Sequence, residues 1–495
     1  MKFGTAHKTL VAGLLLVSVS CASWAQRGRS ADRIDRVTRT VENAQRRAEA
    51  AQDRIARIPE QAARAEKAQE RAGRAPNQVE RALRAERAAR AGRIESRSAE
   101  RARGKGGEGN GGRRQRAEAQ RGGKSEAKFS EREQSLADAQ QQRQQALVRL
   151  HPGELEMTTT GPAVRAQVVA IDPSPAALAA ALRAGFTLLS QETIEGLDIR
   201  SVTLRTPRGM AVDQALAQLA RHGEFSPNHL HLPTSAATMP SASAAAPLAG
   251  ARVEGRPALG IIDGGVARHS SLGGAIEQRG FAQGAPAANA HATAVASLAV
   301  GQGPLRGAFP GASLLVADIY GRDPTGGNAV ALIRAIGWMA ARGVPVVAIT
   351  LAGPSNPLVA KAVTKAFQRG LYIVAPVGNG GPAAPPAFPA SYPQVVAVTG
   401  VDRRNRVLIE SGRCPSLDYA APAAGFRAAN AAGGLHPVRG TSFAVPFVAA
   451  RLAALAKTGP RPLSLLDREA VDLGPRGADR LYGRGLVCSK CRPAS

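Results

Sequence analysis

The sequence predicts an α/β protein whose main domain is a mostly parallel sheet covered by helices on both faces. A small α+β domain and a basic arm precede it. Two observations lead to this prediction. After residue 255, short unbroken apolar runs alternate with helical stretches, which is typical of parallel strands buried on both sides. Between residues 160 and 233, the pattern follows the order strand, helix, strand, strand, helix, strand, which is the ferredoxin-like arrangement.

Length and composition agree with several domains. A chain of 495 residues is too long for one ordinary domain, and 44% hydrophobic residues are enough for a sizeable core. Only 4% are aromatic, so that core must consist of Ala, Val, Leu and Ile. The formal net charge is +27, and about half of it lies in residues 27–150. The charge is therefore mainly a property of an N-terminal arm.

Residues 1–25 have the pattern of a secretory signal peptide. Lys2 and Lys8 precede an apolar run, and Ser23-Trp24-Ala25 resembles a cleavage site. The run is short for a bilayer span, although an uncleaved anchor or a lipid attached at Cys21 are alternatives. No transmembrane segment is expected after it. We therefore expect the protein to be secreted or periplasmic.

Residues 26–150 are predicted to be a helical or disordered arm. Apolar residues spaced alternately three and four apart over 34–58 favour one weak coiled-coil helix, and the Gly- and Arg-rich stretch 104–123 favours disorder. The arm could tether the protein to an anionic envelope partner, but a solvated spacer is the favoured interpretation. No aromatic residues lie between the arginines, which argues against specific nucleic-acid binding.

The domain over residues 160–233 is predicted from alternating and helical periodicities. Expected strands are 164–171, 186–190, 199–204 and 225–232, and expected helices are 175–183, capped by Ser174, and 211–221. Residues 234–254, rich in Ala, Ser and Pro near their start, are predicted to be an exposed linker that proteases can cut.

The domain over residues 255–490 follows. Expected strands are 258–262, 313–319, 344–351, 371–377 and 395–401, and expected helices are 327–341 and 357–369. Functional groups of such a sheet belong at the carboxyl ends of its strands. Asp263 and Asn379 come directly after two of these apolar runs.

Three side chains and one amide suggest a serine hydrolase. Asp263 lies in Leu-Gly-Ile-Ile-Asp-Gly-Gly, and His291 opens an apolar helix. Ser442 lies in Gly-Thr-Ser at the start of another apolar helix, predicted over 443–455. A serine hydroxyl needs a base to take its proton, and a carboxylate orients the imidazole that serves as this base. Asn379, in Val-Gly-Asn-Gly-Gly, can donate an N–H to a developing oxyanion.

These motifs, in the order Asp, His, Ser, resemble those of the subtilisin-like serine peptidase family. The resemblance implies a subtilisin-like fold, an Asp263–His291–Ser442 triad, an oxyanion asparagine at 379, and polypeptide substrates cleaved through an acyl-enzyme. It also implies that Leu351, Ala352 and Gly353 form an edge strand that binds extended substrate. No cofactor is implied. Calcium often stabilises this family, but no acidic cluster in the sequence indicates a site.

The segment 162–233 also resembles the propeptides of this family, which assist folding and inhibit the enzyme. The resemblance implies that its C-terminal strand and the linker lie in the active site until they are cleaved. That predicts a self-processed zymogen with its own propeptide-like segment as a partner. Two departures stand out: Ala292 replaces the usual Gly after the catalytic His, where it could strain the helix start, and Ala294 replaces a usual second His. The alternative is a catalytically weak homologue that acts as a binding scaffold through its basic arm.

The cysteines leave several pairings open. Removal of the signal peptide would leave Cys414, Cys488 and Cys491, of which two are expected to pair in an oxidising compartment. Cys488-Ser-Lys-Cys491 could be a zinc half-site or a redox pair, but a structural disulfide is the favoured interpretation, since no second half-site exists. His269 and His436 are interpreted as loop residues and not as metal ligands.

Overall fold

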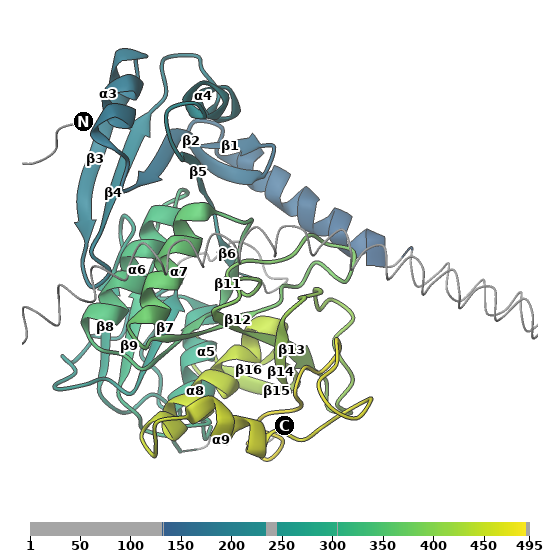
Figure 1. Cartoon of the computed structure of the whole chain (residues 1–495). Coiled ribbons are helices and arrows are strands. Elements are labelled where there is room, and N and C mark those ends of the chain that lie inside the picture. The colour runs from purple at the N-terminus through teal and green to yellow at the C-terminus, as the bar shows by residue number, and fades with distance from the viewer. Residues whose placement is uncertain (1–130, 132, 234–244, 304, 492–495) are drawn as a thin grey trace, which may run out of the picture. The chain divides into compact units, whose positions relative to one another are not determined.

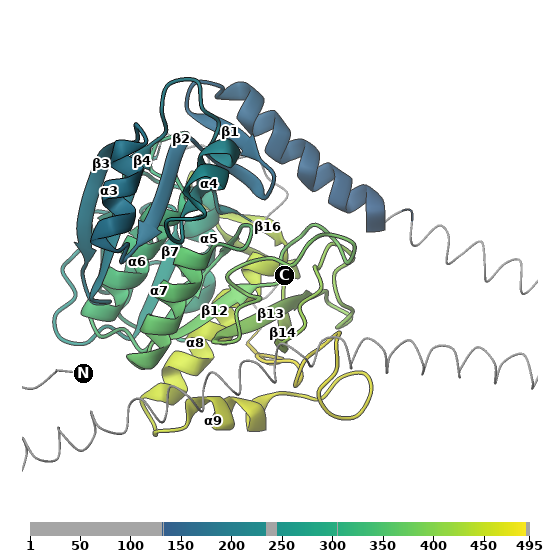
Figure 2. The same ribbon diagram turned by 45° about the horizontal axis from the view of Figure 1, so that its top comes forward.

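A computed structural model describes residues 131, 133–233, 245–303 and 305–491 (Figure 1). The predicted signal peptide, the coiled-coil helix and most of the linker lie outside the described residues. Within the described ranges, no helix is long and apolar enough to cross a membrane. Figure 2 shows the same ribbon turned so that the N-terminal elements come forward.

The main domain is built on a seven-stranded parallel sheet in the order β14-β13-β12-β10-β7-β9-β8. Its strands are β7 (Leu259–Asp263), β8 (Ile276–Gly280), β9 (Leu314–Asp318), β10 (Val346–Ile349), β12 (Tyr372–Pro376), β13 (Val395–Val401) and β14 (Leu417–Pro422). Four of them, β7, β9, β10 and β13, are buried along their whole length. This confirms the prediction that their unbroken apolar runs belong to a sheet covered on both faces.

Helices cover the two faces of this sheet. α5 (Ala290–Val300) and α8 (Val445–Ala456) pack on one face, and α6 (Ala329–Ala341) and α7 (Pro357–Gln368) on the other (Figure 1). Alternate side chains of one strand serve the two cores: Ile261 belongs to the α5/α8 core and Ile262 to the α6/α7 core. The hairpin of β15 (Ala424–Ala429) and β16 (Leu435–Arg439) and the helix α9 (Pro462–Glu469) complete the domain.

The preceding domain is an antiparallel sheet with two helices, α3 (Pro175–Arg183) and α4 (Val212–Leu219). Its strands are β1 (Leu155–Thr158), β2 (Gly161–Ile171), β3 (Thr187–Ile194), β4 (Ile199–Arg205) and β5 (Ser226–His229). The order β5-β2-β4-β3 agrees with the predicted strand–helix pattern, and β1 pairs with β2 as an additional strand. Ser174 caps α3 as expected, because its Oγ accepts the Ala177 N–H.

The predicted strand over 225–232 differs most from the structure. It divides at Leu230 and His231: β5 stays in the antiparallel sheet, whereas β6 (Leu232–Pro233) pairs antiparallel with β11 (Leu351–Ala352) of the main domain. The predicted strand over 344–351 likewise divides into β10 and β11. Each interruption allows the chain to leave one sheet and pair elsewhere.

The antiparallel sheet packs on α6 and α7 (Figure 2). Gly337 of α6 allows close approach, since a Cβ there would lie 2.4 Å from the Glu195 carbonyl oxygen. Ion pairs surround this contact: Arg334 with Glu192 at 2.5 Å, Lys361 with Asp172 at 3.1 Å, and Arg369 with Asp198. Because these pairs are partly exposed, packing contributes more to the interface than charge does.

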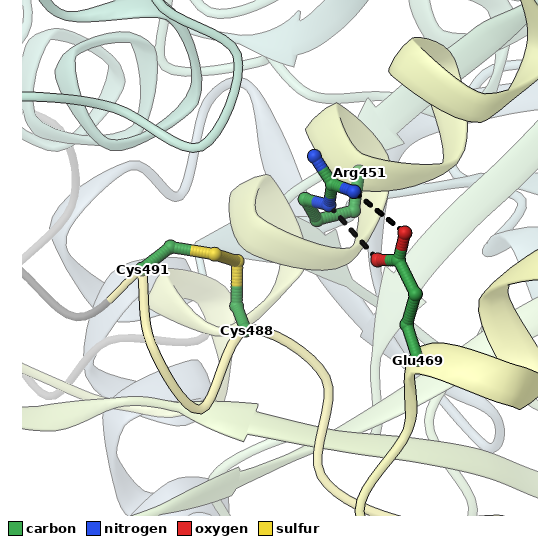
Figure 3. The surroundings of a disulfide bond; sticks show 4 residues. All are labelled: Arg451, Glu469, Cys488 and Cys491. Atoms are coloured by element: carbon green, nitrogen blue, oxygen red, sulfur yellow. Dashed lines mark hydrogen bonds and ion pairs between the residues drawn. A yellow bond between two sulfur atoms is a disulfide. The ribbon is translucent and has the colours of Figure 1, made fainter.

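A disulfide joins Cys488 to Cys491, which is the pairing that the sequence favours (Figure 3). Both residues pack against the α5/α8 core. Beside them, Arg451 of α8 and Glu469 of α9 form an ion pair at 2.6 Å. Cys414 is a buried free thiol whose Sγ lies 3.7 Å from the Ala390 carbonyl oxygen.

Candidate active site

Asp263 is the last residue of β7 and is 1% exposed. Its Oδ1 accepts the Gly264 N–H at 2.6 Å, and its Oδ2 accepts the hydroxyl of Thr350, which lies between β10 and β11. These bonds replace the water that a buried carboxylate loses. They also fix the carboxylate with Oδ2 toward the neighbouring helix α5.

His291 is the second residue of α5. Asn289 caps the helix, because its Oδ1 accepts the N–H groups of His291 at 2.8 Å and Ala292 at 3.1 Å. Gly264 brings this cap close to the end of β7, since a Cβ at Gly264 would lie 2.8 Å from Asn289 Cβ. The methyl group of Ala292 is buried in a helix that starts regularly, so this departure from the family pattern leaves the helix start intact.

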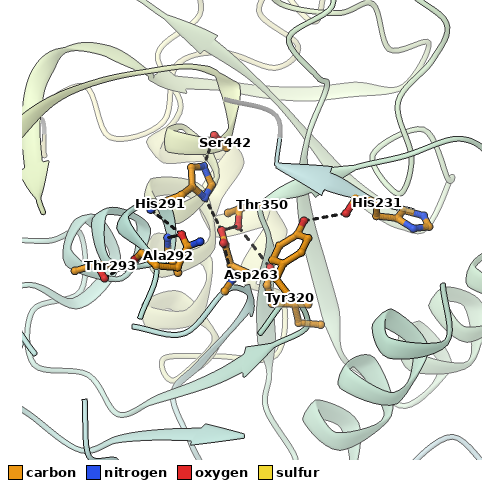
Figure 4. Close-up of polar contacts among 11 residues, drawn as sticks. His231, Asp263, His291, Ala292, Thr293, Tyr320, Thr350 and Ser442 are labelled. Carbon is orange, nitrogen blue, oxygen red and sulfur yellow. Dashed lines mark hydrogen bonds and ion pairs between the residues drawn. The ribbon is translucent and has the colours of Figure 1, made fainter. Parts of the chain in front are cut away.

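The imidazole joins the carboxylate to the hydroxyl (Figure 4). His291 Nδ1 lies 2.7 Å from Asp263 Oδ2, and Nε2 lies 2.9 Å from Ser442 Oγ. An Nδ1–H that donates to the carboxylate leaves Nε2 as the acceptor of the hydroxyl proton. The Phe443 ring packs against the imidazole with a centroid separation of 5.0 Å, which limits its rotation. The three residues therefore form one continuous hydrogen-bonded path.

Ser442 lies in a 3-10 turn, η1 (Thr441–Phe443), directly before α8. The sequence predicts a helix from Phe443; α8 begins two residues later because this tighter turn precedes it. Gly440 enters the turn at φ 136°, which only glycine adopts easily. Ser442 is fully buried, and its hydroxyl faces His291.

Asn379 follows β12 and is tied to the same turn. Its Oδ1 accepts the Thr441 N–H at 3.0 Å, and the Thr441 hydroxyl donates to the Gly378 carbonyl oxygen at 3.2 Å. The Thr441 bond identifies which end of the carboxamide carries oxygen, and so which end carries the NH2 group. Asn379 is thus hydrogen-bonded to the backbone of the residue that directly precedes Ser442.

The edge strand predicted to bind substrate is paired with the chain itself. Leu351 pairs with Pro233 and Ala352 with Leu232. The backbone of Gly353 pairs instead with Phe388, at 2.8 Å and 3.0 Å. A Cβ at Gly353 would lie 2.6 Å from the ring of His231, so glycine gives that ring its space.

Residues 230–233 are held on the side opposite β11 as well. The His231 N–H donates to the Gly327 carbonyl oxygen at 2.8 Å, and the buried Tyr320 hydroxyl donates to the His231 carbonyl oxygen at 2.9 Å (Figure 4). The segment thus lies between β11 and the start of α6. It has the extended backbone and the two-sided hydrogen bonding of a bound peptide.

Two histidines are buried here in their neutral form: His231 within this segment and His229 just before it. His231 is fully buried, neither ring nitrogen has a hydrogen-bond partner among the described residues, and burial lowers its pKa to about 3. Burial lowers the pKa of His229 to about 4, and the Asp213 carboxylate opposes this shift. His229 Nδ1 lies 3.1 Å from Asn356 Nδ2, and Nε2 lies 2.7 Å from Thr160 Oγ1.

Burial and nearby carboxylates also shift the pKa values of Asp318 and Tyr320. Burial raises the pKa of Asp318, which accepts N–H groups from Ala287, Tyr320 and Gly321. Burial and the negative charges of Asp263 and Asp318 raise the pKa of Tyr320 well above its ordinary value. Tyr320 therefore keeps its proton and remains a donor to the His231 carbonyl oxygen.

Sequence reasoning missed three residues that support the site. Asn289 could have been found, because an Asn directly before an apolar helix is a common N-cap. Thr350 and Tyr320 carried no signal, since only the folded sheet brings them to Asp263 and to residues 230–233. His269 lies in a loop as predicted, with Nε2 2.8 Å from the Gly434 carbonyl oxygen, whereas His436 belongs to β16. No group of three His, Cys, Asp or Glu side chains in the described ranges could hold a metal ion.

A hydroxyl, an imidazole and a carboxylate joined in this way at the carboxyl edge of a parallel sheet define a serine hydrolase of the α/β class. The sequence profile of the Subtilase family matches residues 256–485. Residues 256–485, which contain all three of these side chains, therefore form a domain of the Subtilase family.

Individual relatives agree with this assignment. The chain is 28% identical over 246 residues to the minor extracellular protease Epr of Bacillus subtilis, covering 47% of this chain and 38% of Epr. It is 29% identical over 245 residues to subtilisin BL of Lederbergia lenta, covering 46% of this chain and 87% of that protein. Fervidolysin from Fervidobacterium pennivorans, a keratinolytic enzyme related to subtilisin, has the same fold with a TM-score of 0.53 at 19% identity. The match covers 67% of this chain and 61% of fervidolysin.

Proposed function

We propose that this protein is an extracytoplasmic serine endopeptidase that is made as a precursor and processes itself. The observation that carries the proposal is the hydrogen-bonded path from Asp263 through His291 to Ser442. The signal-peptide pattern of residues 1–25 supports export. The basic arm would then lie outside the cytoplasm. Its favoured role there remains that of a solvated spacer.

The chemistry follows from the geometry. The Ser442 hydroxyl transfers its proton to His291 Nε2 as Oγ attacks the substrate carbonyl carbon. Asp263 stabilises the imidazolium, and the N–H groups of Asn379 and of the turn at Ser442 stabilise the oxyanion. His291 then gives its proton to the leaving amine, which leaves an acyl-enzyme. His291 next activates a water molecule that hydrolyses the ester and frees Ser442.

The pairing of β11 supports a polypeptide as the substrate. Leu351 and Ala352 bind Pro233 and Leu232 through the backbone, which an extended peptide of another sequence could reproduce. A small ester would leave these backbone groups without partners. Gly353 would contribute space for a side chain, because its own backbone is already paired with Phe388.

The same pairing supports a precursor. Residues 160–233 would act as an internal inhibitor, with Leu232 and Pro233 in the position of a substrate or product. The linker 234–254 would contain the self-processing site. The ion pairs and the packing on α6 and α7 would keep the inhibitor bound after the cut, so that activity appears only when it leaves.

Active-site labelling tests this function. We expect a fluorophosphonate to label the mature protein once, at Ser442, and we expect the mature protein to degrade casein. Labelling detects the activated serine whatever the natural substrate is, whereas casein distinguishes a peptidase from an esterase. A correctly folded, processed protein that neither reacts with the probe nor cleaves casein would favour the binding-scaffold alternative.

Acidification should weaken the hold on residues 226–233. The pKa values of His229 and His231 are lower in the docked segment than in the released one, so release lets both imidazoles bind protons. Docking is therefore strongest above pH 6.5 and weakens as the pH falls toward 4. At pH 5, each of the two histidines should cost about 2 kcal/mol. Hydrogen exchange of these amides in the Ser442→Ala protein, at pH 7.5 and pH 5, measures the change.

The control separates these histidines from a general acid effect. His231→Leu should remove about half of the pH dependence, because leucine stays neutral at every pH. His222, a half-exposed histidine of the same domain, shows no such burial, so His222→Leu should leave the pH dependence as it is. Equal protection at both pH values in the Ser442→Ala protein, after correction for the slower exchange of free amides at lower pH, would contradict the prediction.

A further inference from the structure

A helix over residues 133–150 precedes β1 and contacts both domains. It is the blue helix that leads into β1 in Figures 1 and 2. The sequence assigns it to the basic arm. Its C-terminal half is anchored by Leu147, which is 5% exposed and packs with Leu155, Val164 and Leu230. One apolar cluster thus joins the helix to residues 230–233, which occupy β11.

The N-terminal half of the helix lies on the turn that follows Asn379. A Cβ at Gly380 would lie 1.8 Å from Gln140 Oε1, and a Cβ at Gly381 would lie 3.1 Å from Leu136 Cβ. Any larger residue at Gly380 would force the Gln140 side chain away. The two glycines therefore form a surface that this helix fits closely.

A cavity of about 480 Å³ lies between the helix and the candidate active site. Gln140 and Gln144 belong to its helical wall, and Gly353, Asn379 and Pro233 belong to its other walls. The cavity is therefore bounded by the end of the segment on β11, by the oxyanion asparagine and by the helix. A substrate that passes beyond β11 toward Asn379 would meet the helix.

We propose that residues 133–150 form a second inhibitory element, which binds the surface formed by Gly380 and Gly381. This inference rests on the proposed function. Leu232 and Pro233 fill the substrate strand, and the helix closes the cleft on the side of Asn379. Because Leu147 and Leu230 share one cluster, the two elements leave together. A cut in the linker would release one fragment that carries both elements and that inhibits the mature enzyme in trans.

The test compares two contact residues with an exposed neighbour that lies outside the cavity wall. Full-length chains carrying Leu136→Ala and Gln140→Ala together are allowed to process. The inhibition constant of the excised fragment is then measured with a chromogenic peptide. We expect this constant to rise about tenfold, and the lag before full activity to shorten. Gln142 is exposed and does not line the cavity, so Gln142→Ala should match the parent. The fully matured enzymes should have equal kcat, because the substituted residues leave with the fragment.

A second measurement reports docking without catalysis. In Ser442→Ala chains, trypsin should cut after Arg143 faster when Leu147→Asp removes the anchor, whereas Arg149→Asp, at an exposed position, should have no effect. Unchanged inhibition in the Leu136→Ala, Gln140→Ala protein would overturn the second-element proposal while leaving the enzyme intact. Absence of labelling and processing in the parent would instead overturn the proposed function.

Discussion

Ser442→Ala should accumulate as a precursor that retains residues 160–233, whereas the parent protein loses them. The substitution removes the hydroxyl oxygen that lies next to His291 Nε2 and that would attack the carbonyl carbon. In subtilisin itself, removal of the corresponding serine lowers kcat by about 2 × 10⁶, and we expect a loss of similar size here. Mass spectrometry of the purified protein and casein hydrolysis measure the two effects.

Another buried serine provides the control. Ser411 is 4% exposed, and its hydroxyl has no hydrogen-bond partner in the part of the chain that the structure describes, so Ser411→Ala should process and hydrolyse casein like the parent. Ser442→Ala should also unfold no earlier than the parent precursor, since a buried methyl group replaces a hydroxyl. If Ser442→Ala matured to the same N-terminus as the parent, another protease would perform the cut, and self-processing would be wrong.

Asp263→Asn should lower kcat by about 10⁴ with little change in KM. The carboxylate accepts hydrogen bonds at both oxygens, from Gly264 and from Thr350 and His291. An asparagine turns one of these acceptors into a donor, so at least one bond becomes a clash of hydrogens. The imidazole then loses its fixed tautomer, and Nε2 no longer faces the hydroxyl as a ready acceptor. Steady-state kinetics with a chromogenic peptide measure both constants.

Thr350 gives this prediction a graded companion. Thr350→Ser keeps the hydroxyl that donates to Asp263 and should retain most of the activity. Thr350→Val removes it and should show a partial loss. A pH profile separates positioning from folding, because a displaced carboxylate moves the acidic limb of kcat whereas a folding defect lowers the whole profile. Asp263→Asn with near-parent kcat would mean that His291 is oriented by other groups.

The sequence was informative wherever local pattern and burial coincide. The helix over 175–183 and the strand over 395–401 have the predicted bounds, because a capped helix and an unbroken β-branched run each satisfy their backbone locally or in the sheet centre. The main-domain strands β8, β14, β15 and β16 were not predicted. Of these, β8 (Ile276–Gly280) and β16 are polar edge or hairpin strands whose side chains are largely not buried, so they show no apolar period.

The helix over 133–150 shows a second kind of limit. Its composition of Gln, Arg and Ala is that of a solvated arm, and a single buried leucine, Leu147, decides that it docks. The division of the strand over 225–232 is similar. Its second half pairs with β11; the resemblance to the family's propeptides points to the active site, but no local property of residues 232 and 233 indicates that partner.

The amino-acid order alone therefore indicated the type of sheet, and it indicated which hydroxyl, imidazole and carboxylate carry the proposed chemistry. Those features depend on residue type and on short spacings, which are visible in the amino-acid sequence. Only the tertiary structure decided which side chains contact one another. His291 contacts Asp263, 28 positions away in the sequence, and Ser442, 151 positions away. Thr350 bonds to Asp263, Tyr320 bonds to His231, and residues 133–150 form one wall of the cavity beside Asn379. Such long-range contacts arise from the packing of the whole sheet and its helices, so they cannot be predicted from any one segment of the sequence.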